Sequence, residues 1–71
     1  MSSPDKLVYM ANQIATFFES QRRENRVERV ALHLRDFWDP AMRSELLRIV
    51  DSGGGRLSPL VLDAAERLRN A

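Results

Sequence analysis

Three prolines divide this sequence into helical segments, because each follows a residue that can cap a helix. The pairs are Ser3-Pro4, Asp39-Pro40 and Ser58-Pro59. Proline is favoured at the first helical position, and the serine or aspartate before it can accept a hydrogen bond from an otherwise unpaired backbone N–H. The three pairs therefore predict three helix starts.

Apolar residues recur at helical spacing in four segments and predict helices over residues 4–20, 24–37, 40–51 and 59–70. The expected core stripes of the first two helices are Leu7, Met10, Ile14 and Phe17, and Val27, Val30, Leu34 and Phe37, with Ala11, Phe18, Ala31 and Trp38 beside them. Those of the last two helices are Met42, Leu46, Ile49 and Val50, and Val61, Ala64, Ala65 and Leu68. Residues 21–26 carry no strong cap, which leaves open whether the first two helices are nearly continuous.

The connections between these helices are short, so helices that follow one another in sequence are expected to be neighbours in space. Ser52-Gly53-Gly54-Gly55 ends the third helix, since glycine readily adopts the left-handed conformation that follows a helix. Leu57, just before the fourth helix, is expected to pack on Leu62 as a hydrophobic staple. No alternating apolar pattern predicts a strand. We expect an all-α fold, a small bundle of three to four helices, forming a single helical domain over residues 1–71.

A bundle of this size has little core of its own. A chain of 71 residues buries about 60% of its unfolded surface, and such a core rarely supplies more than ~3–5 kcal/mol. There is no cysteine, so no disulfide and no thiolate metal site adds to this. Packing against another chain is the remaining route to stability.

Charge and hydropathy exclude several classes of function. The net charge is +1, too balanced for a strong phosphate-binding surface, so no nucleic acid partner is expected. No apolar run approaches the ~20 residues that span a membrane, and residues 1–5 lack the features of a signal peptide. Together with the missing cysteines, this favours a soluble, cytoplasmic chain. The basic residues are ten arginines and Lys6, which indicates either protein contacts or a GC-rich genome.

The residues give no sign of catalysis. The glycine run is followed by Arg56-Leu57-Ser58-Pro59 rather than the Gly-Lys-Ser/Thr of a phosphate-binding loop. His33 is the only histidine, and a zinc site around it would need three carboxylates. It lies one turn from Phe37, with Asp36 within helical reach, and is interpreted as a partly buried structural or interface residue. No catalytic, cofactor-binding or metal-ligating residue is assigned.

Several side chains suggest a second buried surface instead. Trp38, at the junction of two helices, closes the small core or anchors an interface, and it can do both, since tryptophan and arginine are enriched among interface hot spots. Tyr9, Leu32 and Leu47 lie off the core stripes of their helices. The basic cluster of Arg22, Arg23, Arg26 and Arg29 is interrupted by glutamates and is interpreted as a solvated face rather than a binding patch.

Three blocks carry a family resemblance: residues 6–18 (KLVYMANQIATFF), 33–43 (HLRDFWDPAMR) and 54–61 (GGRLSPLV). In order and spacing they resemble the delta subunit of soluble, molybdenum-containing, NAD-dependent formate dehydrogenases. The blocks cover about half of the chain, and MANQI and FWDPxMR are the most specific parts.

The resemblance implies a non-catalytic accessory subunit within a complex that oxidises formate to carbon dioxide and passes electrons to NAD. Its most direct partner would be the catalytic alpha subunit, with beta and gamma subunits in the same complex. The molybdenum–pterin cofactor, iron–sulfur clusters and FMN would lie in those larger subunits and none in this chain. The role would be assembly, stability or cofactor insertion. By position, the implied contact residues are Tyr9, Asn12, Gln13, His33, Trp38, Met42 and Arg43.

Two other functions stay open. A helix-turn-helix DNA-binding domain would use residues 40–51 for recognition, although Arg43 and Arg48 are opposed there by Glu45 and Asp51. A self-associating bundle would bury the off-stripe residues in a homodimer of the isolated chain. For the accessory subunit, Trp38→Ala and Arg43→Ala are expected to weaken the complex more than they unfold the free chain.

Overall fold

Four helices form the protein in a computed structural model that describes residues 4–20 and 25–70. They are α1 (Pro4–Glu19), α2 (Arg26–Phe37), α3 (Pro40–Asp51) and α4 (Pro59–Asn70). No strand occurs in the described ranges, and the expected all-α fold is confirmed. The bounds of α3 and α4 agree with the sequence pattern. The expected cap Ser3 and the expected start of the second helix at Glu24 lie outside the described residues.

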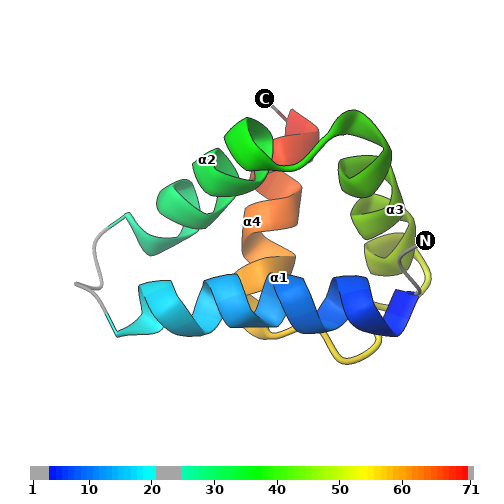
Figure 1. The fold of residues 1–71 in the computed structure, drawn as a ribbon, viewed down its shortest axis with the longest axis horizontal. Helices are drawn as coiled ribbons and strands as arrows, with labels where there is room; N and C mark the ends of the chain where they lie inside the picture. The colour runs from blue at the N-terminus through cyan, green and yellow to red at the C-terminus, as the bar shows by residue number, and fades with distance from the viewer. Residues whose placement is uncertain (1–3, 21–24, 71) are drawn as a thin grey trace.

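The four helices pack around one core. In Figure 1, α1 runs along the lower edge, α2 and α3 lie above it, and α4 lies between them, running from behind α1 toward the end of α2. The first helix contacts all three others, and α2 packs most extensively on α4. Asn25, immediately before α2, has φ 64°, a left-handed conformation that does not continue a helix. The first two helices are therefore separate, and their suggested near-continuity is wrong.

Capping at the predicted junctions fixes where α3 and α4 begin. The Asp39 carboxylate accepts a hydrogen bond from the Met42 backbone N–H at 2.8 Å, and Pro40 follows as the first helical residue. The Ser58 hydroxyl accepts one from the Val61 N–H at 3.4 Å. Both prolines lack a backbone N–H at a position where it would have had no partner in the helix.

The glycine run ends α3 as a Schellman motif. The Gly54 N–H donates to the Ile49 carbonyl at 3.0 Å, and the Gly53 N–H donates to the Val50 carbonyl at 3.1 Å. All three glycines have positive φ. Gly54 is also buried, close to Leu62, so at this position the absence of a side chain matters for packing as well as for the backbone.

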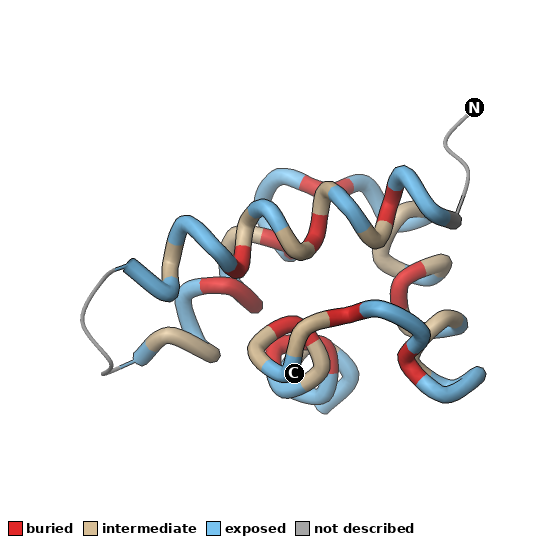
Figure 2. Tube along the Cα trace, turned by 90° about the horizontal axis from the view of Figure 1, so that it is seen from below, coloured by how far each residue is buried: buried red, intermediate tan, exposed pale blue. Residues whose placement is uncertain are grey.

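Small residues occupy much of the core. Ala11 and Ala15 of α1, Ala31 of α2, and Ala64 and Ala65 of α4 are all buried, together with Leu7, Val30, Leu34, Leu46, Leu57 and Val61. Figure 2 shows how buried and exposed stretches alternate along the helices. Two residues of the expected stripes are wrong: Phe17 is 61% exposed and Phe37 is 75% exposed. In α1 the line Leu7, Ala11, Ala15 faces the core, and Phe17 lies on its flank.

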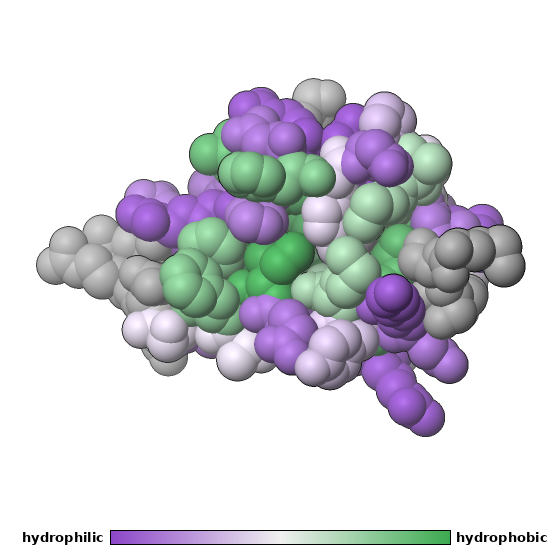
Figure 3. All heavy atoms as spheres, viewed as in Figure 1, coloured by the Kyte–Doolittle hydropathy of each residue, from purple (hydrophilic) through white to green (hydrophobic). Residues whose placement is uncertain are grey.

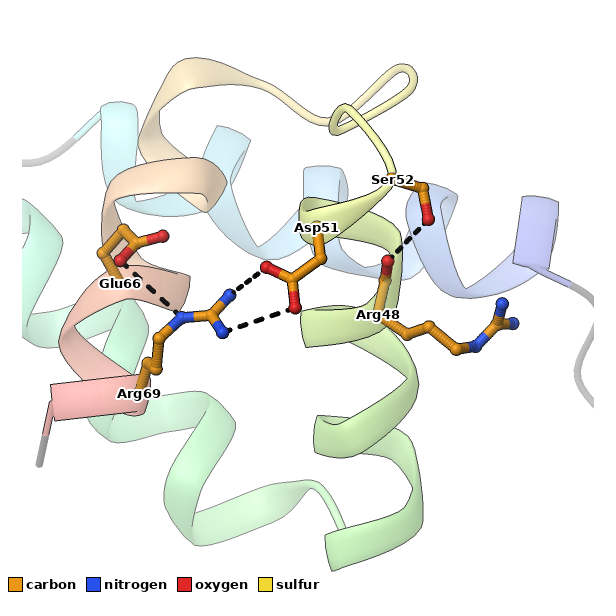
Figure 4. Close-up of polar contacts among 5 residues, drawn as sticks. All are labelled: Arg48, Asp51, Ser52, Glu66 and Arg69. Carbon is orange, nitrogen blue, oxygen red and sulfur yellow. Dashed lines mark hydrogen bonds and ion pairs between the residues drawn. The ribbon is translucent and has the colours of Figure 1, made fainter.

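Ion pairs on the surface connect α4 to two other helices. Arg69 donates to both carboxylate oxygens of Asp51 at the end of α3, at 2.7 and 3.4 Å, and lies 3.7 Å from Glu66 (Figure 4). The hydrogen bonds to Asp51, and then its charge, raise the pKa of the Arg69 guanidinium. Arg67 pairs with Glu28 of α2. These pairs are exposed, so each contributes little to stability.

Replacing Gly54 by alanine should destabilise the fold more than the same change at Gly55. Gly54 has φ +83°, and a Cβ there would lie 3.0 Å from Leu62 Cδ2, whereas Gly55 has φ +51° and no atom within 4 Å. The left-handed backbone costs a non-glycine residue about 1–2 kcal/mol at either position, and crowding adds about 1 kcal/mol or more at Gly54 alone. Urea unfolding of both variants, followed by circular dichroism, measures the difference; equal losses would contradict the contact.

Candidate functional site

The seven residues expected to contact a partner lie in different parts of the fold. Trp38, Met42 and Arg43 lie around the junction of α2 and α3. Tyr9, Asn12 and Gln13 lie on neighbouring turns of α1, and His33 lies on α2. Several of them hold the chain together.

Trp38 belongs to the core. Its side chain is 5% exposed, and its backbone N–H donates to the Leu34 carbonyl at 3.1 Å, which ends α2. Burial shows the core role of this residue, and a shared role at an interface stays a prediction. Removal of a buried ring leaves a cavity, so Trp38→Ala should also destabilise the free chain.

Arg43 and Met42 support the same junction. The Arg43 guanidinium donates to the Arg35 carbonyl at 2.9 Å and to the Trp38 carbonyl, both in the last turn of α2 or just after it. These carbonyls have no partner within the helix, so a basic side chain there acts as a cap. Met42 is half-buried against the core cluster. Arg43 therefore joins α3 to α2.

Asn12 connects α1 to the loop before α4. Its side-chain amide donates to the Arg56 carbonyl at 2.9 Å, and its oxygen accepts from the Ser58 N–H at 2.9 Å. Both ends of the side chain are thus used on one loop, 44 and 46 residues further along the chain. The sequence placed Asn12 with the contact residues, but it gave no indication of this connection.

Tyr9 and Gln13 remain on the surface of α1. Tyr9 is 64% exposed, and its hydroxyl accepts a hydrogen bond from the Gln13 amide at 2.6 Å. Tyr9 lines a shallow hollow of about 550 Å³ between α1 and the glycine loop, together with Asp5, Val8, Asn12, Ile49, Gly55 and Arg56. Aromatic, apolar and charged groups all border this hollow.

His33 lies in a row of rings that sequence reasoning did not assemble. Its ring centroid is 4.7 Å from that of Phe37 and 6.0 Å from that of Phe18, which is 5.1 Å from that of Phe17. The row crosses from α1 to α2. Leu32, 47% exposed, lies beside it. We call the surface formed by Phe17, Phe18, Leu32, His33 and Phe37 the aromatic groove.

The aromatic groove contains two adjoining hollows. One of about 250 Å³ is lined by Gln13, Ile14, Phe17, Phe18 and His33. The other, of about 220 Å³, is lined by Phe18, Arg29, Leu32, His33, Asp36 and Phe37. Figure 3 shows hydrophobic side chains gathered over α1 and α2 on this side of the molecule, with hydrophilic ones above and below. The exposure of Phe17 and Phe37 was not predicted, because apolar spacing placed both in the core stripes. For Phe17, the spacing of Leu7, Ala11 and Ala15 was a signal that could have indicated a different buried face of α1.

Most charged groups near these surfaces are used within the chain. Asp36 accepts a hydrogen bond from Arg35 Nε at 3.3 Å. Arg26 donates to the Glu19 carbonyl at 2.6 Å, closing the end of α1. Of the basic cluster, Arg22 and Arg23 lie outside the described residues, and Arg29 forms no ion pair with any described carboxylate.

The third helix is a poor DNA-recognition helix. Arg43 is turned onto the end of α2, and Arg48 pairs with Glu45 on its own helix. That pairing, first through the hydrogen bond and then through charge, raises the pKa of Arg48. Neither guanidinium is free to contact a phosphate, so the geometry does not favour the helix-turn-helix hypothesis.

Across residues 4–20 and 25–70, no group of three His, Cys, Asp or Glu side chains is placed to hold a metal ion. With no cysteine in the sequence, the chain also lacks the thiolate ligands that iron–sulfur clusters use. In the same ranges, no helix is both long enough and apolar enough to span a membrane. The fold and its surfaces define a small all-α protein whose exposed features suit contacts with another protein.

Comparison with protein families identifies the chain further. It matches the family described as "NADH-dependant formate dehydrogenase delta subunit FdsD" over residues 6–65. The match covers most of the chain, so this protein belongs to the formate dehydrogenase delta subunit family, and the resemblance drawn from the three blocks is confirmed. Comparisons with curated proteins and with solved structures found no match.

Truncation of Trp38 should destabilise the fold strongly, whereas truncation of its neighbour Phe37 should hardly change its stability. Trp38→Ala empties a buried site and should cost about 3–5 kcal/mol, comparable to the whole stability expected of so small a core. Phe37→Ala removes a ring that is 75% exposed and should change the free energy of unfolding by about 0.5 kcal/mol or less. Thermal melts followed by circular dichroism compare the two. A Trp38→Ala variant that melts with the parent would show that the indole does not hold the core.

Proposed function

We propose that this chain is a non-catalytic accessory subunit that docks on the catalytic alpha subunit of an NAD-dependent formate dehydrogenase in the cytoplasm. Membership of the formate dehydrogenase delta subunit family supports the assignment to such a complex. The observation that carries the accessory role is the contrast between surface and chemistry: the described residues hold no metal-binding group, yet large apolar side chains stay exposed on a small body. Such side chains are typical of a surface that a partner covers.

The proposal places the chemistry in the larger subunits. The molybdenum–pterin cofactor, iron–sulfur clusters and FMN expected of the complex find no matching donor set among the described residues, so no reaction step is assigned to this chain. Its contribution would be to stabilise the alpha subunit or to hold it in a state that accepts its cofactor. Both roles need a protein contact and no titratable centre.

Omitting this chain should lower the active fraction of the complex. We expect alpha, beta and gamma subunits co-expressed with it to retain the chain through affinity and size-exclusion steps. Without it, formate-dependent NAD reduction per alpha subunit should fall several-fold. Molybdenum per alpha subunit, measured by elemental analysis, separates the two roles: it falls if the chain promotes cofactor insertion and stays constant if the chain only stabilises the assembled complex.

Re-expression of the chain together with the other subunits is the control and should restore activity. The proposal is overturned if the chain elutes separately and the three other subunits are fully active without it. Loss of complex yield with unchanged activity per alpha subunit would limit the role to stability.

A further inference from the structure

The aromatic groove is the strongest unassigned surface of the molecule. Phe17 and Phe37 are 61% and 75% exposed, and they lie at the two ends of the ring row that joins α1 to α2. The two hollows share Phe18 and His33, so they adjoin. Two exposed phenylalanines and a leucine gathered on one face of a 71-residue chain indicate an interaction site rather than scattered surface residues.

The backbone around the groove restricts what can occupy it. Residues 13–18 and 29–37 are helical, so their N–H groups and most of their C=O groups are used inside α1 and α2. An extended segment placed on the rings would find no backbone partners and would leave its own polar groups unsatisfied. A helix satisfies these groups internally and presents an apolar face, which is the usual way to fill a hydrophobic groove between helices.

Charge selects among helical partners. Arg29 lines the groove and forms no ion pair with a described carboxylate, and the neighbouring Glu28 is paired with Arg67. Among the described lining residues, Asp36 is the only acidic one, and it accepts a hydrogen bond from Arg35. A second copy of this groove would therefore offer Arg29 only a carboxylate that is already paired. A partner that carries an acidic residue beside its apolar face would complement the groove in both respects.

We infer that the aromatic groove binds an amphipathic helix of the partner subunit, with apolar side chains entering the two hollows and a carboxylate pairing with Arg29. This inference rests on the proposed function, because it takes the partner to be the formate dehydrogenase complex. It moves the contact away from Trp38 and Arg43, which hold the fold, and onto Phe17, Phe37, Leu32 and Arg29. Of the contact residues expected from sequence, it retains His33 and Gln13.

Single substitutions in the groove test the inference on the full chain and the complex. Phe17→Ser and Phe37→Ser remove exposed rings, Arg29→Gln removes the charge and Arg29→Glu reverses it. Arg56→Gln is the matched control, since Arg56 is exposed and lines the hollow between α1 and the glycine loop, away from the groove. Each purified variant is first compared with the parent by circular dichroism, and its affinity for a complex assembled without this chain is then measured by biolayer interferometry.

We expect the two phenylalanine variants to bind about tenfold more weakly or worse, as for aromatic hot spots. Arg29→Glu should weaken binding more than Arg29→Gln, while Arg56→Gln should bind as the parent does. If the parent binds and the groove variants bind equally well, the groove assignment falls while the proposed function stands. Failure of the parent itself to bind overturns the proposed function and the inference with it.

Two further results would indicate a different occupant of the aromatic groove. Tighter binding by Arg29→Glu would reject an acidic partner. If the groove variants lose only self-association, seen by light scattering, and keep their affinity for the complex, the occupant is a second copy and the inference is wrong.

Discussion

Close contact between helices through alanine determines the rest of this structure. Ala11 and Ala15 of α1, Ala31 of α2, and Ala64 and Ala65 of α4 are buried in the core. The distance between packed helices depends on the side chains at the contact, and small residues such as alanine permit a close approach. Small contacts leave little room for large rings between the helices. Trp38, at the C-terminal end of α2, is the one buried aromatic residue among those that the structure describes; Phe17 and Phe37 lie on the flanks of the contact, in the aromatic groove.

A core of small residues buries little apolar surface per helix, and polar contacts at the helix ends supplement it. Asn12 holds α1 to the loop before α4 through two hydrogen bonds, and Arg43 covers the last carbonyls of α2. Arg26 does the same at the end of α1. These contacts fix the relative positions of helices without filling the core, which is how a chain of this size can keep defined junctions. Asn12 and Arg43, whose residue types suggested partner binding, are thus used to hold the helices together.

The sequence predicted where the helices begin and end better than it predicted which side of each helix is buried. The bounds of α3 and α4 follow from local chemistry, because Asp39-Pro40, Ser58-Pro59 and the glycine run act on their immediate neighbours. Phe17 and Phe37 were placed in the core because periodicity identifies an apolar side of a helix and does not say which part of that side is covered. The covered part depends on where α4 and α2 cross, which no local pattern encodes. The two hydrogen bonds of Asn12 could not be predicted from the sequence for the same reason, since their partners lie 44 and 46 residues away.

Residue type alone is thus a poor guide to the contact surface of a small subunit. Tryptophan and arginine are frequent interface anchors, yet here Trp38 is buried and Arg43 caps a helix, so both act before any partner arrives. What a partner can reach is decided by exposure and by unused hydrogen-bonding or charge capacity. Phe17 and Phe37 satisfy the first condition, and Arg29 satisfies the second within the part of the chain that the structure describes. Phe17 and Phe37 lie beside the alanine contacts and not inside them, so the packing that keeps the fold small also leaves these two rings exposed on the surface that we propose for partner binding.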